Sequence, residues 1–298
     1  MSSESYYGTI ALAAGWGKTL NGETPRLMET VELTILSKTE CENKIEEQYG
    51  SRVIIDERYL CSFADPHAIL SSYKDDRNNQ VELDHVCTGI LISRQDVLTA
   101  EHCFANLELN VTEIIVGSSD LNEGIKYYPL WWITYNEWIL QKNMHRQFKE
   151  NDIAVIRLNT KVLETIRLAI LSTLSTYDLY GLKVETAGWG KSNNDRSPRI
   201  METVALRVLR IPECEHKIEK LRGQRIHIPT RVLCTVGEPY ALLNHGDSGG
   251  PLLYNDTVIG INMSTCPKLR QQIHRGQVNL HVYINYYRDY IIDVQNNF

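Results

Sequence analysis

Three segments of the chain carry side chains that could cooperate in nucleophilic catalysis. His102 stands in VLTAEHC, Asp152 in NDIAVIRL and Ser248 in NHGDSGGPL. A serine hydroxyl is a weak nucleophile until a base removes its proton, and histidine can take and return a proton near neutral pH. A buried carboxylate can fix the tautomer of such a histidine and stabilise its imidazolium form. Together the three residue types indicate acyl transfer to the serine.

Each of these residues also has an ordinary structural explanation when it is taken alone. A single histidine is most often structural or solvated, and an aspartate in front of a hydrophobic strand most often belongs to a turn. The segment GDSGGP is more specific, because glycine on both sides of the serine lets the backbone bend sharply and approach a substrate. The N–H groups of Gly246 and Ser248 could then point at a developing oxyanion, which is worth roughly 3–4 kcal/mol per donor. A plain glycine turn is the alternative.

The composition argues against several other classes of function. The 298 residues carry a formal net charge of −6 without a basic stripe, so we expect no nucleic-acid partner. No apolar run approaches the roughly 18 residues that a membrane-spanning helix needs, so we expect no membrane partner. The seven cysteines include no CxxC pair, and no calcium loop of regularly spaced acidic residues is visible. We therefore expect neither a metal nor a cofactor.

The cysteines and the glycosylation motifs favour an oxidising, extracellular location. Dispersed cysteines fit disulfides, and seven leave at least one unpaired. Asn110, Asn255 and Asn262 each begin an N-glycosylation motif. The first residues, MSSESYYGTIALAAGWG, lack the basic start and the apolar core of a signal peptide. We expect a secreted protein whose signal peptide is absent from this chain, as in a fragment or a faulty gene model.

An internal repeat explains the front of the chain. Residues 15–62 match residues 188–235 at a constant offset of 173, with 25 of 48 positions identical. Each copy keeps two cysteines that are 20 residues apart, which predicts the equivalent disulfides Cys41–Cys61 and Cys214–Cys234. The second copy continues into GDSGGPLL, whereas the first stops before any such serine. We expect a domain boundary after residue 62, with a partial copy in residues 1–62 and a nearly whole unit in 63–298.

The larger unit contains many short segments rich in β-branched and aromatic residues, separated by turn signals. This pattern predicts an all-β barrel or sandwich. Two segments predict helices. One is PECEHKIEKLRG, which ends at Gly223, and the other is YINYYRDYIIDVQNNF at the end of the chain, whose apolar face should dock against a barrel wall. Cys87 and Cys103, sixteen residues apart, could fasten the loop of His102. The apolar face of the last helix comprises Ile284, Tyr287, Ile291 and Val294.

The segments LTAEHC, DIAVIRL, AGWGK and GDSGGPL, in this order, resemble the chymotrypsin-like (trypsin-like) serine proteases, peptidase family S1, of insect venom or digestive type. The resemblance covers about residues 80–298. It implies an all-β fold of two six-stranded antiparallel β-barrels with a C-terminal helix, here preceded by a partial duplicate of the second barrel. It also implies that His102 is the base, Asp152 its orienting carboxylate and Ser248 the nucleophile, with Gly246 and Ser248 forming the oxyanion hole.

The chain departs from the family in its activation. Family members are cut before a hydrophobic residue that is followed by Val-Gly-Gly, and the new amine pairs with the acid that corresponds to Asp247. This chain has no such tetrapeptide, and a cut after Arg58 would open the loop between Cys41 and Cys61. A buried carboxylate without a partner costs several kcal/mol. We therefore expect the oxyanion loop to stay disordered in the absence of the amine.

The substrate pocket departs from the family as well. By the resemblance, Leu242, Thr265 and His281 belong to the pocket, and Leu242 at its base favours an apolar residue before the scissile bond. Asn244 stands where the cysteine partner of Cys266 would be, which makes Cys266 the candidate for the unpaired thiol. The segment INMSTC replaces the family's Ser-Trp-Gly strand that binds the substrate backbone.

These observations lead to one main hypothesis and one alternative. The main hypothesis is a secreted serine endopeptidase acting on protein or peptide substrates, with protease inhibitors as further partners. The alternative is a catalytically impaired homologue that binds or regulates other proteins. The partial copy at the front exposes sheet edges that invite pairing, so it could inhibit or dimerise, or it could be the remnant of two fused genes.

Overall fold

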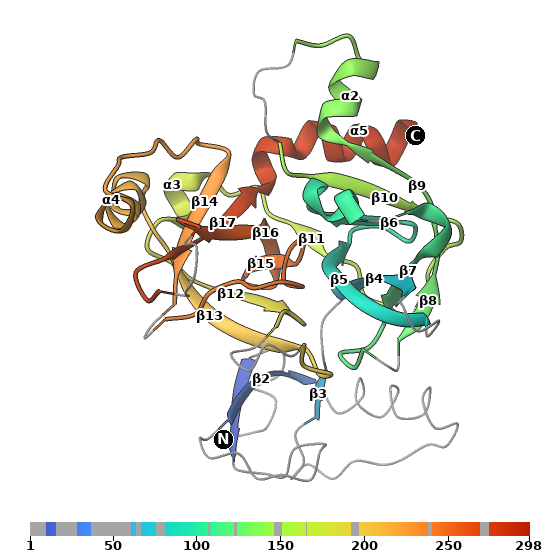
Figure 1. The fold of residues 1–298 in the computed structure, drawn as a ribbon. Helices are drawn as coiled ribbons and strands as arrows, with labels where there is room; N and C mark the ends of the chain where they lie inside the picture. The colour runs from blue at the N-terminus through green and yellow to red at the C-terminus, as the bar shows by residue number, and fades with distance from the viewer. Residues whose placement is uncertain are drawn as a thin grey trace. The chain divides into compact units, whose positions relative to one another are not determined.

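The computed structural model divides the chain into two compact units, residues 1–65 and 66–298. Within them it describes residues 10–15, 29–36, 61–63, 67–75, 81–106, 108–121, 124–145, 151–164, 166–191, 197–237, 240–268 and 274–298 (Figure 1).

The first unit contains one three-stranded antiparallel sheet of order β1-β2-β3. Its strands are β1 (Ile10–Gly15), β2 (Glu29–Leu36) and β3 (Cys61–Phe63). Cys41 lies outside the described residues, so the predicted disulfide Cys41–Cys61 does too.

The second unit begins with a curled seven-stranded antiparallel sheet of order β8-β7-β4-β5-β6-β10-β9. In the described part of the chain no hydrogen-bonded ladder joins its two outer strands, β8 and β9, so this sheet differs from the closed six-stranded barrel that we expected. The extra strand β8 pairs with β7 and extends that edge. The strands are β4 (His67–Asp75), β5 (Val81–Leu91), β6 (Asp96–Thr99), β7 (Thr112–Val116), β8 (Ile125–Tyr127), β9 (Pro129–Thr134) and β10 (Ala154–Leu158).

The other sheet of this unit closes into the expected six-stranded antiparallel barrel. Its order is β16-β15-β12-β13-β14-β17, and a ladder between β16 and β17 completes the ring. A short strand, β11 (Ile170–Leu171), adds to β16 in parallel. The barrel strands are β12 (Lys183–Gly188), β13 (Glu202–Val208), β14 (Val232–Val236), β15 (Pro251–Tyr254), β16 (Thr257–Cys266) and β17 (Val278–Tyr283).

The strands of the first unit repeat the pairing of three barrel strands. In β1–β2, Ile10 pairs with Thr34, and in β12–β13, Lys183 pairs with Arg207, so both partners shift by the same 173 positions as the sequence repeat. The next ladder agrees, because Thr34 pairs with Phe63 in β2–β3 and Arg207 with Val236 in β13–β14. The duplicated sequence thus folds with an unchanged strand register.

Helices cover the ends of the sheets. The α-helices are α2 (Tyr135–Gln141), α3 (Thr176–Leu179), α4 (Ile211–Arg222) and α5 (Arg288–Asn297), and the 3-10 helices are η2 (Glu101–Asn106), η3 (Leu109–Val111) and η4 (Ile284–Tyr287). Helix α4 ends at Gly223, whose φ of 73° is left-handed, as the sequence predicts. In the described part of the chain, no helix has the length and apolar character to cross a membrane.

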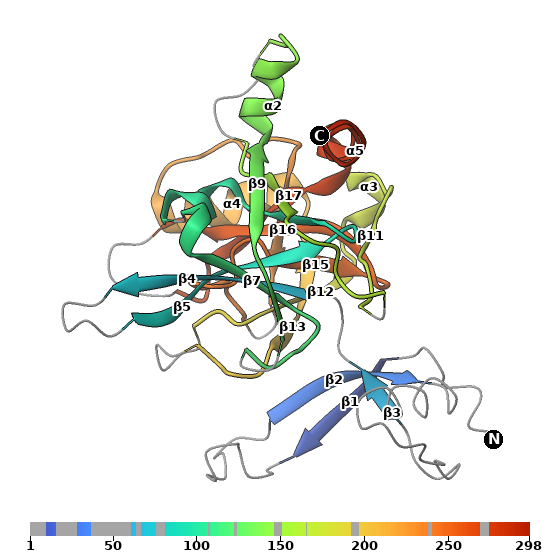
Figure 2. The ribbon, with the colours of Figure 1, turned by 90° about the vertical axis from the view of Figure 1, so that its right-hand side faces the viewer.

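The apolar face that the sequence predicts for the end of the chain is buried, and it extends over two successive helices, η4 and α5. Ile284, Tyr287, Ile291 and Val294 are at most 2% exposed. They pack in a cluster that also contains Ile90 and Leu98 of one sheet and Ile261 and Val282 of the other, so the two helices contribute to the core between the two sheets. Both views show α2 and α5 together at one end of the unit (Figures 1 and 2), where Trp138 Nε1 donates to Asp293 Oδ2 at 2.7 Å.

Candidate active site

His102 and Asp152 form a hydrogen-bonded pair at the ends of two neighbouring strands. His102 lies in η2 directly after β6, and Asp152 lies just before β10, which is the antiparallel neighbour of β6. His102 Nδ1 is 2.8 Å from Asp152 Oδ2, and the main-chain N–H of His102 donates to Asp152 Oδ1 at 2.9 Å. Because a carboxylate only accepts, Nδ1 carries a proton, and in the neutral form of the imidazole Nε2 therefore has the lone pair. The histidine thus presents a basic nitrogen to its surroundings.

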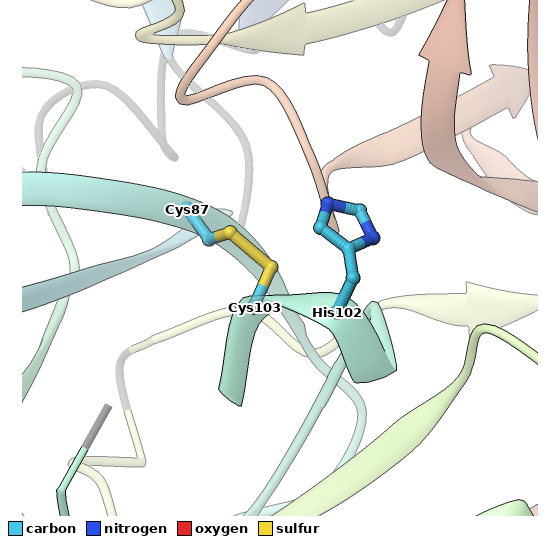
Figure 3. A group of neighbouring side chains, drawn as sticks. All are labelled: Cys87, His102 and Cys103. Atoms are coloured by element: carbon cyan, nitrogen blue, oxygen red, sulfur yellow. A yellow bond between two sulfur atoms is a disulfide. The ribbon is translucent and has the colours of Figure 1, made fainter. Parts of the chain in front are cut away.

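A disulfide fixes the turn that carries His102. Cys87 of β5 and Cys103 of η2 are bonded, with their Cα atoms 6.2 Å apart. Figure 3 shows the imidazole rising from the same helical turn as Cys103, next to the disulfide. Potential ligand atoms of these three residues lie within 4.8 Å of one another. Both sulfurs are consumed by the disulfide, and the thiolate is the form of cysteine that binds metal. The disulfide of this cluster therefore joins β5 to the turn of His102 and leaves no thiolate that could bind a metal.

The loop that carries Ser248 packs against β5 and β6 of the other sheet. Thr88 of β5 donates its main-chain N–H to the Ser248 carbonyl at 2.8 Å, and its hydroxyl donates to the Gly246 carbonyl at 2.8 Å. Gly249 has a φ of +81°, and a Cβ there would lie 2.1 Å from Thr99 Oγ1. The Ser248 carbonyl is 4.0 Å from Cys103 Sγ. The loop of Ser248 therefore lies beside the turn of His102, and its close approach to Thr99 requires glycine at position 249.

The hydroxyl of Ser248 and the two expected oxyanion donors make no hydrogen bond to the described residues. Neither Ser248 Oγ nor His102 Nε2 has such a partner, so the bond between these two atoms is not formed in this structure. The N–H groups of Gly246 and Ser248 likewise donate to no acceptor in the described part of the chain. Hydrogen bonds of catalytic groups are often long before the substrate arrives.

The carboxylate oxygens of Asp247 accept hydrogen bonds from two backbone N–H groups. Oδ1 accepts from the N–H of Gly190 and Oδ2 from the N–H of Asn244, each at 2.9 Å. Within the described residues it forms no ion pair, and burial raises the pKa of its carboxyl. The carboxyl faces a cavity of about 410 Å³ that is also lined by Leu242, Asn244 and Asn279. In this structure two backbone N–H groups therefore bind the carboxylate for which the resemblance predicts a cationic partner.

Of the three expected pocket residues, Leu242 and Thr265 both adjoin Asn279, whereas His281 is buried away from any open cavity of the described residues. Leu242 lines the Asp247 cavity, and Thr265 lies in β16 opposite Asn279 of β17. His281 is 0% exposed and lies in the interior of the barrel, where it cannot line a pocket open to substrate. Burial lowers the pKa of its imidazole from 6.5 to about 3. The side chain of His281 was expected to fill pocket space, but the alternation along β17 turns it inward.

A second cavity adjoins the His102–Asp152 pair. It has a volume of about 620 Å³, and His102 and Asp152 form part of its wall. Polar residues such as Asn136 and Arg231 occupy other parts of the wall. The apolar lining consists of Ile228, Pro229, Val232, Met263, Leu280 and Val282. This space is large enough for substrate side chains.

The remaining cysteines and glycosylation motifs have the following environments. Cys214 and Cys234 form a disulfide, and Cys266 is a free, half-buried thiol. Asn110 and Asn255 are exposed, so their motifs are accessible. Asn262 is 0% exposed, and its motif cannot carry a glycan in the folded protein.

The comparisons with known proteins agree with this architecture. The family model described as Trypsin matches residues 67–291. The chain belongs to the trypsin family. It is 25% identical over 186 residues to trypsin iota of Drosophila melanogaster, an alignment that covers 61% of this chain and 69% of that protein. It is 29% identical over 216 residues to snake venom serine protease rhinocerase 4 of Bitis rhinoceros, covering 69% of this chain and 76% of that protein.

A solved structure extends the agreement to the fold. Neuropsin, a serine protease expressed in the limbic system of mouse brain, superimposes with a TM-score of 0.58 at 19% identity, over 77% of this chain and 94% of that chain. The resemblance to chymotrypsin-like proteases that the sequence indicates is thereby confirmed, and the trypsin-family chain is a serine-type endopeptidase by homology.

Proposed function

We propose that this protein is a secreted endopeptidase that cleaves peptide bonds through an acyl-enzyme on Ser248. His102 acts as the base and Asp152 as its orienting carboxylate. The observation that carries the proposal is the pair of hydrogen bonds that the Asp152 carboxylate accepts from the Nδ1–H and the main-chain N–H of His102. It holds the imidazole in the tautomer that has a free lone pair on Nε2.

The proposed reaction assigns one step to each of these groups. Nε2 of His102 takes the Ser248 proton as Oγ bonds to the peptide carbonyl carbon, and the carbonyl oxygen becomes an oxyanion. The N–H groups of Gly246 and Ser248 can donate to it, each worth about 3 kcal/mol. The imidazolium then gives the proton to the leaving amine as the peptide C–N bond breaks. Water attacks the acyl-enzyme in the same way, with His102 again accepting and returning the proton.

The extracellular location rests on the chemistry of the chain. Two disulfides, Cys87–Cys103 and Cys214–Cys234, fasten the described part of the larger unit, and disulfides persist in oxidising compartments. Asn110 and Asn255 are exposed at glycosylation motifs, which agrees with the same location.

One observation favours the alternative, a homologue that binds proteins without cleaving them. Ser248 Oγ has no bond to His102 Nε2, and Asp247 forms no ion pair among the described residues. A fluorophosphonate probe distinguishes the two functions, because it reacts only with an activated serine. We expect labelling of the full secreted chain that is lost in Ser248→Ala and kept in Ser264→Ala, a matched serine beside the His102 cavity. An unlabelled wild-type chain that remains folded would support the binding function instead.

A further inference from the structure

Four polar side chains form a buried network inside the closed barrel, directly behind the loop of Ser248. They are Thr186 of β12, Thr235 of β14, Asn262 of β16 and His281 of β17, and their exposed fractions are 4%, 0%, 0% and 0%. Burial of a polar group is costly unless its hydrogen bonds are made. We therefore expect each of these four side chains to have a hydrogen-bond partner.

The hydrogen positions in this network follow from the chemistry of its atoms. Asn262 Oδ1 only accepts, so His281 Nδ1, at 3.0 Å, carries the proton. The imidazole is neutral, so its Nε2 accepts from the Thr235 hydroxyl at 2.8 Å. Asn262 Nδ2 donates a hydrogen bond to Thr186 Oγ1 at 2.8 Å. The Thr186 hydroxyl in turn donates a hydrogen bond to the Pro251 carbonyl at 2.8 Å. The amide of Asn262 is thereby locked in one orientation.

The locked amide donates its second proton to the loop of Ser248. Asn262 Nδ2 is 3.1 Å from the carbonyl oxygen of Asp247, which also accepts from the N–H of Gly250 at 3.1 Å. The backbone of Asn262 holds the other side of the serine, because its carbonyl accepts from Gly249 at 2.9 Å and its N–H donates to Gly250 at 2.7 Å. Asn262 thus contacts the loop both before and after Ser248.

The Asp247 carbonyl matters because it shares a peptide plane with the N–H of Ser248. In a planar trans peptide the C=O and the N–H point in opposite directions. Asn262 Nδ2 holds the Asp247 carbonyl towards the barrel interior, so the Ser248 N–H points away from the interior. On that side the N–H has no acceptor among the described residues. That N–H is one of the two donors of the proposed oxyanion hole.

We propose that Asn262 is a positioning residue that orients the Ser248 N–H for the oxyanion. The inference rests on the proposed function. It also explains why a residue in a glycosylation motif is completely buried: its amide is used inside the protein. Thr186 and His281 hold the amide, and Thr235 holds the imidazole of His281.

The test compares two variants of the full chain. Asn262→Leu keeps the approximate volume but removes the donor. Tyr290→Phe is the control for general loss of stability, because Tyr290 is 1% exposed and its hydroxyl donates to the carbonyl of Ile133 in β9 instead of to the loop of Ser248. For hydrolysis of a small peptide ester we expect Asn262→Leu to lower kcat about 10- to 100-fold, the range of a weakened oxyanion donor, with KM changed less than threefold. Tyr290→Phe should keep kcat within twofold.

An inhibitor pair separates positioning from a general structural effect. A peptidyl trifluoromethyl ketone forms a tetrahedral adduct with an oxyanion, whereas the matching unreactive peptide amide does not. Asn262→Leu should weaken inhibition by the ketone by the same factor as kcat/KM, and leave inhibition by the amide unchanged. Equal weakening of both inhibitors, or unchanged kcat, would overturn the inference. If Asn262→Leu does not fold, Asn262→Ser replaces it, because its side chain is too short to reach the Asp247 carbonyl.

The outcome also separates this inference from the proposed function. A wild-type chain that the fluorophosphonate probe does not label refutes both. A labelled wild-type chain in which Asn262→Leu and Tyr290→Phe behave alike refutes only the role of Asn262.

Discussion

His281 makes the stability of the fold depend on pH in a window that can be calculated. Its imidazole bonds to the uncharged Thr235 and Asn262, and burial lowers its pKa from 6.5 to about 3. In the unfolded chain the same side chain binds a proton near pH 6.5. Between about pH 6.5 and pH 3 the unfolded state therefore binds more protons than the folded state, and stability is lost as the pH falls through this window.

The size of the effect follows from the two pKa values. Proton linkage through His281 lowers the free energy of unfolding by about 2 kcal/mol between pH 7 and pH 5, and by about 3 kcal/mol between pH 7 and pH 4. Asp247 acts with the opposite sign, because burial raises the pKa of its carboxyl above the ordinary value of 3.8. Its contribution to stability is present at acid pH and is lost as the pH rises through the raised pKa.

The assay is urea unfolding of the full chain with its disulfides intact, followed by tryptophan fluorescence at pH 7, 6 and 5. The reference is His281→Gln, whose amide can donate to Asn262 and accept from Thr235 but does not titrate. Asp247 contributes equally to both proteins, so the difference between their pH slopes isolates His281. We expect the wild type to lose about 2 kcal/mol more than the variant from pH 7 to pH 5. Parallel curves would refute the assignment of a neutral, buried imidazole.

Three further substitutions test the site and its supports. In Asp152→Asn the amide oxygen still accepts from the main-chain N–H of His102, but the NH2 group faces Nδ1. Nδ1 must then accept, which moves the proton to Nε2. We therefore expect kcat/KM for a peptide ester to fall about 10⁴-fold. Replacing Cys214 and Cys234 by alanine opens a loop with a sequence separation of 20, and urea unfolding should show a loss of about 3 kcal/mol. Gly249→Ala places a Cβ 2.1 Å from Thr99 Oγ1 at a φ of +81°. We therefore expect it to abolish fluorophosphonate labelling and to lower Tm. A labelled variant with the wild-type Tm would contradict the described conformation of the loop.

Local sequence patterns predict a large part of this structure. His102 and Asp152 each adjoin a hydrophobic strand, and the pairing of β6 with β10 brings the ends of those strands together. The sequence also predicts the apolar face of η4 and α5 and the end of α4 at Gly223. Both depend on local properties, namely the spacing of side chains along a helix and the left-handed conformation of glycine.

The polar interior of the barrel could not be predicted in the same way. Thr186, Thr235, Asn262 and His281 come from four strands. Thr235, Asn262 and His281 are each a single polar residue between apolar neighbours, and Thr186 follows Glu185, so neither pattern distinguishes them from surface positions. In addition, Asn262 stands in a glycosylation motif, which points to the surface. Only the strand register, which places Asn262 opposite His281, reveals that they meet inside the barrel. Long-range pairing of this kind leaves no periodic signal in one sequence.

The identical registers of β1–β2 and β12–β13 have a consequence for the order in which the barrel assembles. The first unit reproduces the pairing of Lys183 with Arg207 at Ile10 and Thr34, although its sequence repeat ends before any counterpart of β15, β16 or β17. The pairing of this hairpin therefore does not require β15, β16 or β17. Because short chain closures cost less conformational entropy than long ones, the hairpin can nucleate before the distant ladder between Glu185 and Leu253 forms. Ser248, the proposed nucleophile, precedes β15 and would then reach its final place late in folding.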